Sequence, residues 1–239
     1  MTRFVVPVLA VVAMVGLVVT QSMIFFDTPI EVSYLPDGSL SGSSLYFNYN
    51  IVYYHVAHAF MLFAAVGVSG VCSIIYLAKR DPKWDDIALS SAEVAVAFGA
   101  VVLMTGSIWA KAAWDHWWVW ENRLTMSLLL WLTLVGYVLV RRFAGATGDR
   151  LAAGMAVFGM IGVPFIYTMV KADDSHPQAG ANGVAATMPP SMKLALWSSV
   201  ATFFVWFLVL LIMRVKSARA ERELRELREQ GLDAGVLTS

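Results

Sequence analysis

Hydrophobic residues gather into six long runs along the chain, separated by shorter and more polar stretches. A helix needs about 20 mainly apolar residues to cross the hydrocarbon layer of a membrane. Each run reaches or approaches that length, so the pattern predicts an all-α, polytopic membrane protein. The six transmembrane helices are expected at residues 4–26, 51–77, 87–109, 124–140, 151–170 and 194–213.

The first run lies at the N-terminus, where a cleaved signal peptide is the alternative interpretation. Residues 4–26 exceed the apolar core of a signal peptide, which is about 7–15 residues long, and no clear cleavage site follows. We therefore expect this helix to be retained. The chain has no visible internal repeat, and we expect one transmembrane domain over residues 1–216, followed by a cytoplasmic charged helical tail over 217–239.

Lys and Arg are distributed unevenly over the segments between the runs, and this asymmetry predicts the orientation. Short cytoplasmic segments carry an excess of basic residues. Residues 27–50 contain none, and residues 171–193 contain only two. Basic residues instead follow the second and fourth runs and fill the tail, at Lys79, Arg80, Lys83, Arg141, Arg142, Arg150, Arg214, Lys216, Arg219, Arg222, Arg225 and Arg228. We predict an N-in/C-in topology, with the segments 27–50, 110–123 and 171–193 facing outward.

Charged residues of both signs alternate in the tail, and their spacing predicts a helix that continues the sixth span. Opposite charges four residues apart support an exposed helix. Such pairs are Arg219/Glu223, Glu221/Arg225, Arg222/Glu226 and Arg225/Glu229. The tail is then either a solvated, salt-bridged helix or a docking surface for a cytoplasmic partner.

Composition supports the membrane assignment and excludes some functions. Hydrophobic residues make up 59% of the chain and charged residues 14%, whereas soluble domains contain about 25% charged residues. Cys72 is the only cysteine, so neither an intramolecular disulfide nor the Cys-x-x-Cys-His attachment site of c-type haem is possible. No phosphate-binding P-loop motif occurs. We expect no enzyme activity in this chain, and any ATP hydrolysis would belong to a partner.

Tryptophan is concentrated in one outward segment, where five of the nine lie within twelve residues. An aromatic belt at the membrane interface explains one or two such residues, but five exceed what anchoring needs. Clustered indoles form a flat apolar shelf for a large planar ligand. Lys111 and Arg123 flank the shelf and are suited to pair with carboxylates. A flat apolar body with acidic groups on one edge describes haem.

The four histidines, His55, His58, His116 and His176, all lie near predicted span ends or in outward segments. An imidazole in or near a membrane is a candidate functional group and a usual axial ligand of haem iron. The alternative for each is an interfacial, hydrogen-bonded side chain. The residues alone leave both interpretations open.

The core of the tryptophan segment is the motif Trp117-Trp118-Val119-Trp120-Glu121-Asn122-Arg123-Leu124-Thr125. It resembles the tryptophan-rich WWD signature of haem-handling proteins in cytochrome c maturation. With its length, span count and loop order, the chain resembles the CcmC family, the haem-handling membrane subunit of the system I pathway. Three positions depart from the family pattern: Glu121 replaces an aspartate, Ala110 a glycine, and Ala57 a proline.

The resemblance implies a haem site. The family has histidines in the contexts of His55 and His176, so these are the expected axial ligands of the iron. His58 lies three residues from His55, on the same helix face, as an alternative ligand or a partner to the ligand, and His116 receives no role. The other expected contacts with the cofactor are Trp109, Lys111, Trp114, Trp117, Trp118, Trp120, Glu121 and Arg123.

The resemblance also implies a function. The WWD-type haem-handling domain over residues 1–216 would bind haem b transiently at the periplasmic face of the bacterial inner membrane. It would present this haem to a CcmE-type haem chaperone. The expected complex contains ABC transporter subunits of the CcmA and CcmB type and a small CcmD-type subunit.

Three other functions are compatible with parts of the pattern. A WWD haem lyase or synthase would share the signature, although such chains are usually larger. An electron-transfer cytochrome b would place histidine pairs deep within its spans, whereas no histidine lies at the middle of a predicted span. A structural or transporter subunit with an aromatic belt would bind no haem.

Overall fold

The structure, a computed structural model, describes residues 2–28, 36, 50–144, 148–172 and 188–236. In this part of the chain all regular structure is helical, and six helices are long and apolar enough to span a membrane. The elements are α1 (Thr2–Ser22), η1 (Met23–Asp27), α2 (Ile51–Lys79), α3 (Pro82–Trp114), α4 (Asn122–Phe143), α5 (Gly148–Ala172) and α7 (Pro190–Asp233). The predicted fold class and the six predicted spans are confirmed.

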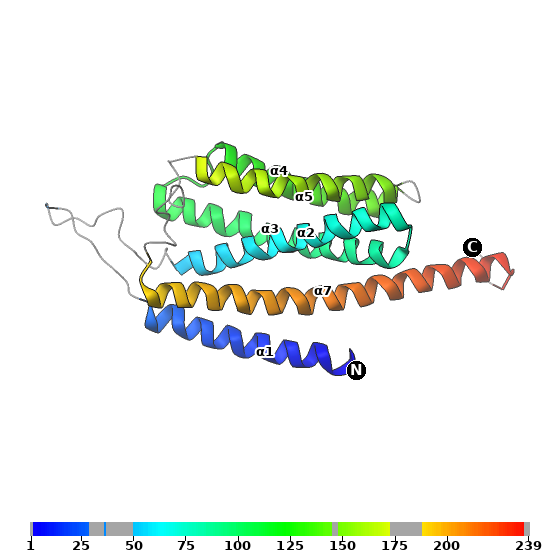
Figure 1. The fold of residues 1–239 in the computed structure, drawn as a ribbon, viewed down its shortest axis with the longest axis horizontal. Helices are drawn as coiled ribbons and strands as arrows, with labels where there is room; N and C mark the ends of the chain where they lie inside the picture. Colours follow the sequence, from blue (N-terminus) through cyan, green and yellow to red (C-terminus); the bar gives the residue numbers. More distant parts are fainter. Residues whose placement is uncertain (1, 29–35, 37–49, 145–147, 173–187, 237–239) are drawn as a thin grey trace.

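The helices lie side by side in an elongated bundle (Figure 1). The hairpin of α2 and α3 occupies the middle, with α4 and α5 on one side of it and α7 on the other, and α1 packs on α7. Both ends of the chain lie at the same end of the bundle, as an even number of spans requires. The assignment of that end to the cytoplasm stays a prediction.

Small residues and two reciprocal hydrogen bonds join α2 to α3. Ser69 Oγ of α2 donates to the carbonyl oxygen of Ala88 in α3 at 2.9 Å, and Ser91 Oγ of α3 donates to the carbonyl oxygen of Ala65 in α2 at 2.8 Å. All four residues are buried. Hydrogen bonds of this kind hold helices together in membranes, where burial of apolar surface drives little association. They fix the register in which residues of α3 meet His55 of α2.

The turn between α2 and α3 is specified locally. Arg80 ends α2 in a left-handed conformation, with φ at 58°. Asp81 then caps α3, because its side chain accepts a hydrogen bond from the Lys83 backbone N–H at 3.0 Å. Pro82 occupies the first turn, where its missing N–H costs nothing. These caps start α3 five residues before the predicted span, and the helix also continues five residues past the predicted end, to Trp114.

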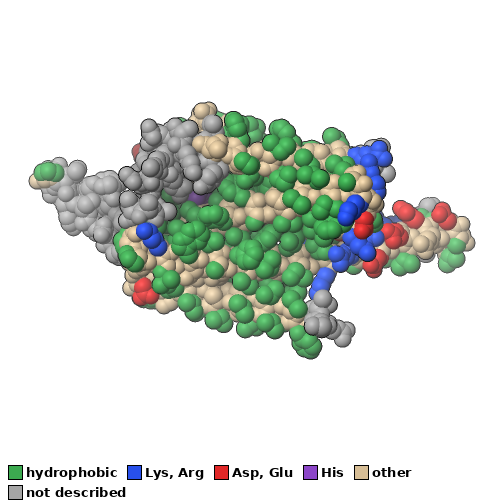
Figure 2. Space-filling view, in the orientation of Figure 1, with side chains coloured by type: hydrophobic (Ala, Val, Ile, Leu, Met, Phe, Trp, Pro, Cys, Tyr) green, Lys and Arg blue, Asp and Glu red, His purple; other side chains and the backbone are tan. Residues whose placement is uncertain are grey.

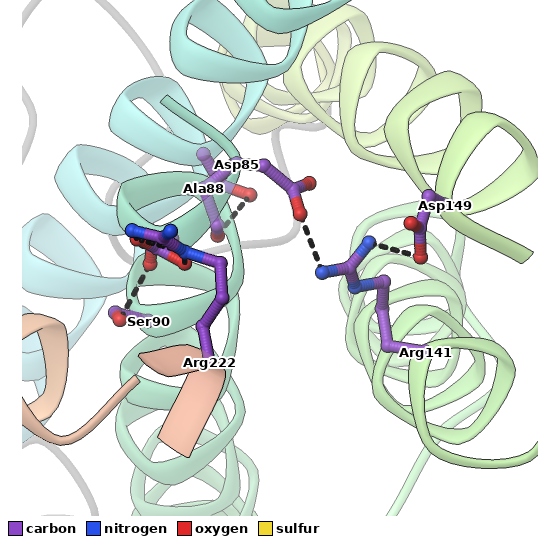
Figure 3. A network of polar contacts seen from close by, with 8 residues as sticks. Asp85, Ala88, Ser90, Arg141, Asp149 and Arg222 are labelled. Carbon is purple, nitrogen blue, oxygen red and sulfur yellow. Dashed lines mark hydrogen bonds and ion pairs between the residues drawn. The ribbon is translucent and has the colours of Figure 1, made fainter. Parts of the chain in front are cut away.

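Ion pairs cluster at the end of the bundle that holds both termini, and we call this the charged end. Figure 2 shows Lys and Arg gathered there. Arg141 of α4 binds Asp85 of α3 at 2.6 Å and also binds Asp149 of α5 (Figure 3). Asp86, the next residue of α3, binds Arg222 of α7 at 3.0 Å. Four helices are thereby joined at one end.

The last helix, α7, is continuous from the bundle into the charged tail, which confirms that the tail extends the sixth span. At 44 residues it is about 66 Å long. All four predicted ion pairs between residues four positions apart lie in the described tail. The structure forms one of them, between Arg222 and Glu226 at 3.1 Å. The stronger attachments run to α3 instead, because Arg222 binds Asp86 and Arg214 binds Glu93.

The first helix has a different environment from the other five, because α1 packs mainly on α7. Thr20 and Thr202 share a hydrogen bond of 3.1 Å across this interface, and both are buried. Gly16 allows the close approach, because a Cβ there would lie 2.9 Å from Thr202 Oγ1. Near the end of α1, Gln21 accepts a hydrogen bond from the Tyr54 hydroxyl of α2.

Candidate functional site

His55 occupies a defined seat between α2 and α3. Its Nδ1 lies 3.0 Å from Thr105 Oγ1. Its ring and the Trp109 indole pack edge to face, with ring centroids 5.9 Å apart and planes at 66°. At Gly106 an added Cβ would lie 3.0 Å from His55 Cε1. We call Thr105, Gly106 and Trp109 the His55 seat.

The spacing of the seat residues explains how one helix supplies all three. Positions i, i+1 and i+4 fall within about 100° around a helix axis. Thr105, Gly106 and Trp109 therefore face α2 together. Trp109 is 8% exposed and belongs to an apolar cluster that also contains Tyr53 and Met192. It is therefore an inner wall of the site rather than part of an exposed shelf.

Arg123 brings a positive charge to the same end of the bundle. It lies in the first turn of α4, and its guanidinium is 3.8 Å from the carboxylate of Glu121, the residue that precedes the helix. The side chains of Arg123 and Glu121 are only 15% and 22% exposed. The charge is thus partly shielded from solvent.

The indoles of the connecting segment lie apart from the His55 seat. Trp118 and Trp120 pack edge to face, with centroids 5.9 Å apart and planes at 75°. They line a shallow apolar hollow of about 230 Å³ with Leu103 and Leu128. A second hollow, of about 560 Å³, is lined by Trp120, Asn122, Thr125, Met126 and Phe165. Trp120 is 76% exposed and Trp117 is 61% exposed.

The seat and the first hollow lie on different faces of α3. Leu103 and Thr105 are two residues apart, so they are separated by about 200° around the helix axis. His55 meets the Thr105 face, while Trp118 and Trp120 cover the Leu103 face. Trp120 extends the indole surface from the first hollow to the second, which α4 and α5 line.

Two further residues of the segment interact with each other. Lys111, in the last turn of α3, binds Asp115, which ends the helix in a left-handed conformation with φ at 62°. The hydrogen bond from Lys111 lowers the pKa of the Asp115 carboxyl. The neighbouring His116 is exposed. The Trp114 backbone ends α3, and its side chain lies outside the described part.

The other histidines differ in their placement. His58 Nδ1 lies 2.7 Å from the Tyr54 carbonyl oxygen, one turn earlier in α2. Its ring packs against Phe98 of α3 and Phe203 of α7, with centroids 5.4 Å and 4.2 Å away. His58 is therefore enclosed by phenyl rings within the bundle. His176 lies outside the described residues, so its role as second axial ligand stays a prediction.

The described residues fit a haem in chemical type. His55 offers an imidazole that bonds to Thr105 through Nδ1, and the indoles offer apolar faces. The Trp118 indole N–H is buried and lacks a hydrogen-bond partner in the same set. Arg123 supplies a cation for a carboxylate. These groups match iron, a porphyrin plane and a propionate respectively.

Thr105 and Gly106 did not emerge from the sequence as site residues. The available signal was a glycine within an apolar span, which often marks close approach of another group. The partner at that point is set by the register of α2 against α3, which is a tertiary property.

Over the described residues, fold and site together define a polytopic membrane protein with six helices able to span the membrane, and with a candidate site for a large, planar, acidic ligand at the end opposite the termini. The chain belongs to the CcmC family, described as "Heme exporter protein C", whose family model matches residues 1–230.

Several curated proteins resemble the chain at about the same level. A "Putative cytochrome c biosynthesis ccmC-like mitochondrial protein" of Marchantia polymorpha is 27% identical over 158 residues, or 66% of this chain and 68% of that protein. "Heme exporter protein C" of Escherichia coli (strain K12) is 29% identical over 162 residues, or 63% and 62%. The protein of the same name from Bradyrhizobium diazoefficiens is 31% identical over 133 residues, or 55% and 49%.

The matched part thus spans about half to two thirds of these relatives' lengths. Six spanning helices and bacterial relatives of this family identify the chain as a multi-pass inner-membrane protein.

Proposed function

We propose that the protein binds haem b at the periplasmic face of the membrane and presents it to a CcmE-type haem chaperone for cytochrome c maturation. One observation carries the proposal: an imidazole, His55, is held by a turn of α3 at the bundle end where the tryptophan segment lies. Family membership and the names of the relatives support haem as the cargo.

Each predicted site residue has a role in this proposal. His55 and His176 are the axial ligands of the iron. The indoles of Trp114, Trp117, Trp118 and Trp120 contact the porphyrin. This contact requires the tryptophan segment to move towards the His55 seat, because Trp118 and Trp120 lie on the other face of α3 in this structure. Trp109 packs against the His55 ring. Arg123, oriented by Glu121, and Lys111 pair with the propionates.

The partners follow from the same proposal. The chain would work beside ABC transporter subunits of the CcmA and CcmB type and a small CcmD-type subunit, which supply the ATP hydrolysis. The charged end faces the cytoplasm, where Lys and Arg are favoured. The side chains of Trp117 and Trp120 are exposed, so a haem bound against them would keep one edge accessible to the chaperone.

Ligand replacement tests the function. His55→Ala and His176→Ala, each in the purified complex, should lower the haem content and block loading of the chaperone, because the iron loses a ligand. His116→Ala is the matched control, since His116 is exposed and has no assigned role. The measurements are the Soret-region spectrum and covalent haem on the chaperone. Normal loading by both ligand variants would contradict the proposal.

A further inference from the structure

The hydroxyl of Thr105 has only one hydrogen, and its surroundings determine where that hydrogen goes. Thr105 Oγ1 lies 2.7 Å from the Val101 carbonyl oxygen and 3.3 Å from that of Val102. A carbonyl oxygen only accepts hydrogen bonds. The hydroxyl therefore donates back to its own helix, and towards His55 it presents lone pairs alone.

The proton on His55 follows from this. His55 Nδ1 lies 3.0 Å from the same Oγ1, so Nδ1 is the donor in this contact. The Val102 carbonyl oxygen also faces the imidazole, and it can only accept a hydrogen bond. A neutral imidazole carries one N–H, and its other nitrogen is an acceptor. Nε2 then holds the free lone pair, and this is the nitrogen available to bind a metal.

We propose that Thr105 is a positioning residue, which holds His55 in the Nδ1–H tautomer and so directs the Nε2 lone pair to the haem iron. This inference rests on the proposed function, in which His55 is an axial ligand. The hydrogen bond made by the other ring nitrogen is what fixes the tautomer and orientation of a ligating histidine.

The rest of the His55 seat fixes the plane of the ring. Gly106 leaves space at Cε1, the carbon between the two nitrogens, where a methyl group would lie 3.0 Å away. Trp109 bounds the ring along another edge. Rotation of the ring about its bond to Cβ would break the Thr105 contact, so the tautomer and the direction of Nε2 are specified together.

The type of acceptor also suits a ligand that must later release its haem. An acceptor on Nδ1–H raises the basicity of Nε2 and strengthens the bond to the metal. Hydrogen bonds to a charged carboxylate are about twice as strong as those between neutral groups. A threonine hydroxyl orients the ring with less strengthening than a carboxylate would give, so it favours transient binding.

Thr105→Val tests the role, because valine keeps the shape and removes the acceptor. Thr105→Ser keeps the acceptor and should restore wild-type behaviour. Thr133→Val is the matched control, because Thr133 makes the same bond to its own helix, to the Leu129 carbonyl at 2.8 Å, at a partly exposed position on α4. All variants are studied as full chains in the purified complex.

Two readouts are independent of chaperone loading. In haem-free protein with ¹⁵N-labelled histidine, NMR should show His55 as the Nδ1–H tautomer in wild type, Thr105→Ser and Thr133→Val, with the signal assigned by its loss in His55→Ala. Thr105→Val should lose this fixed tautomer. In titrations with ferric haem, Thr105→Val should bind about tenfold more weakly or worse, with a shifted midpoint potential.

The outcomes separate the two proposals. If His55→Ala loses haem while Thr105→Val keeps the tautomer and the affinity, the positioning role is wrong and the function stands. If His55→Ala and His176→Ala both retain haem and load the chaperone normally, the proposed function fails. The tautomer of His55 is observed in the wild-type protein itself, with His55→Ala needed only to assign the signal, and an Nε2–H tautomer there would overturn the inference directly.

Discussion

His55 is positioned by contacts that are individually ordinary for a helix pair. The Thr105 hydroxyl lies 3.0 Å from the ring, and the Trp109 indole packs edge to face with it at a centroid distance of 5.9 Å. Gly106, on the same stretch of α3, leaves space where a Cβ would lie 3.0 Å from the ring. Because each contact limits a different motion, the loss of any one should alter ligand geometry before it alters the bundle.

Gly106→Ala tests the space beside the ring. The new methyl group would lie 3.0 Å from Cε1, so the imidazole must shift, and we expect haem affinity to fall about tenfold. Gly136→Ala is the control, because its methyl would meet Met155 Cε at the same distance, and the end of a methionine side chain moves easily. Soret titration of the two purified variants compares them directly, and equal affinities would contradict the steric argument.

At the residue scale, sequence proposes candidate chemistry more readily than geometry. His55 and the tryptophans were predicted as site residues because imidazoles and clustered indoles are rare in an apolar chain and carry specific chemistry. Thr105 was not found, because a threonine that bonds to its own helix is common in a span. Only its distance to His55 Nδ1 distinguishes it from Thr133.

Among the elements, α7 combines a membrane span with a charged extension. Arg214 and Arg222 bind Glu93 and Asp86, both on α3. Helix lengths and the tail helix were predictable, because the bilayer dictates span length and charge spacing indicates an exposed helix. The ion-pair partners of α7 on α3 could not be predicted, because ion pairs between residues more than a hundred positions apart leave no local pattern in the sequence.

Arg222→Gln tests the attachment of the tail to α3. Asp86 is 5% exposed, so loss of Arg222 leaves a buried carboxylate without its charged partner. This loss should weaken the attachment of the tail to α3 by on the order of 1–3 kcal/mol. Backbone hydrogen exchange over residues 217–233 should become about tenfold faster or more. Arg225→Gln, at an exposed tail position, should exchange like wild type. Equal rates in the two variants would show that Asp86 does not anchor the tail.

The whole molecule has two chemically distinct ends, and the basic residues predict which one faces the cytoplasm. Asp115 lies at the tryptophan end with its side chain 88% exposed, and Arg228 is exposed in the tail at the other end. The orientation can therefore be measured by labelling these two positions.

Cysteine labelling in intact cells measures this orientation. A membrane-impermeant maleimide should label Asp115→Cys readily and Arg228→Cys only after the cells are opened. The background should be low, because the only native cysteine, Cys72, is buried. Labelling of Arg228→Cys in intact cells would contradict the predicted orientation, because it would place the tail outside and the His55 seat on the cytoplasmic side.

The pairing of α1 with α7 has a consequence for biosynthesis. The ribosome makes α1 before α7, yet α1 has its main packing surface on α7. During translation α1 therefore stays in lipid without this partner while α2, α3, α4 and α5 are made. The contact between Thr20 and Thr202 forms only after α7 has entered the bilayer.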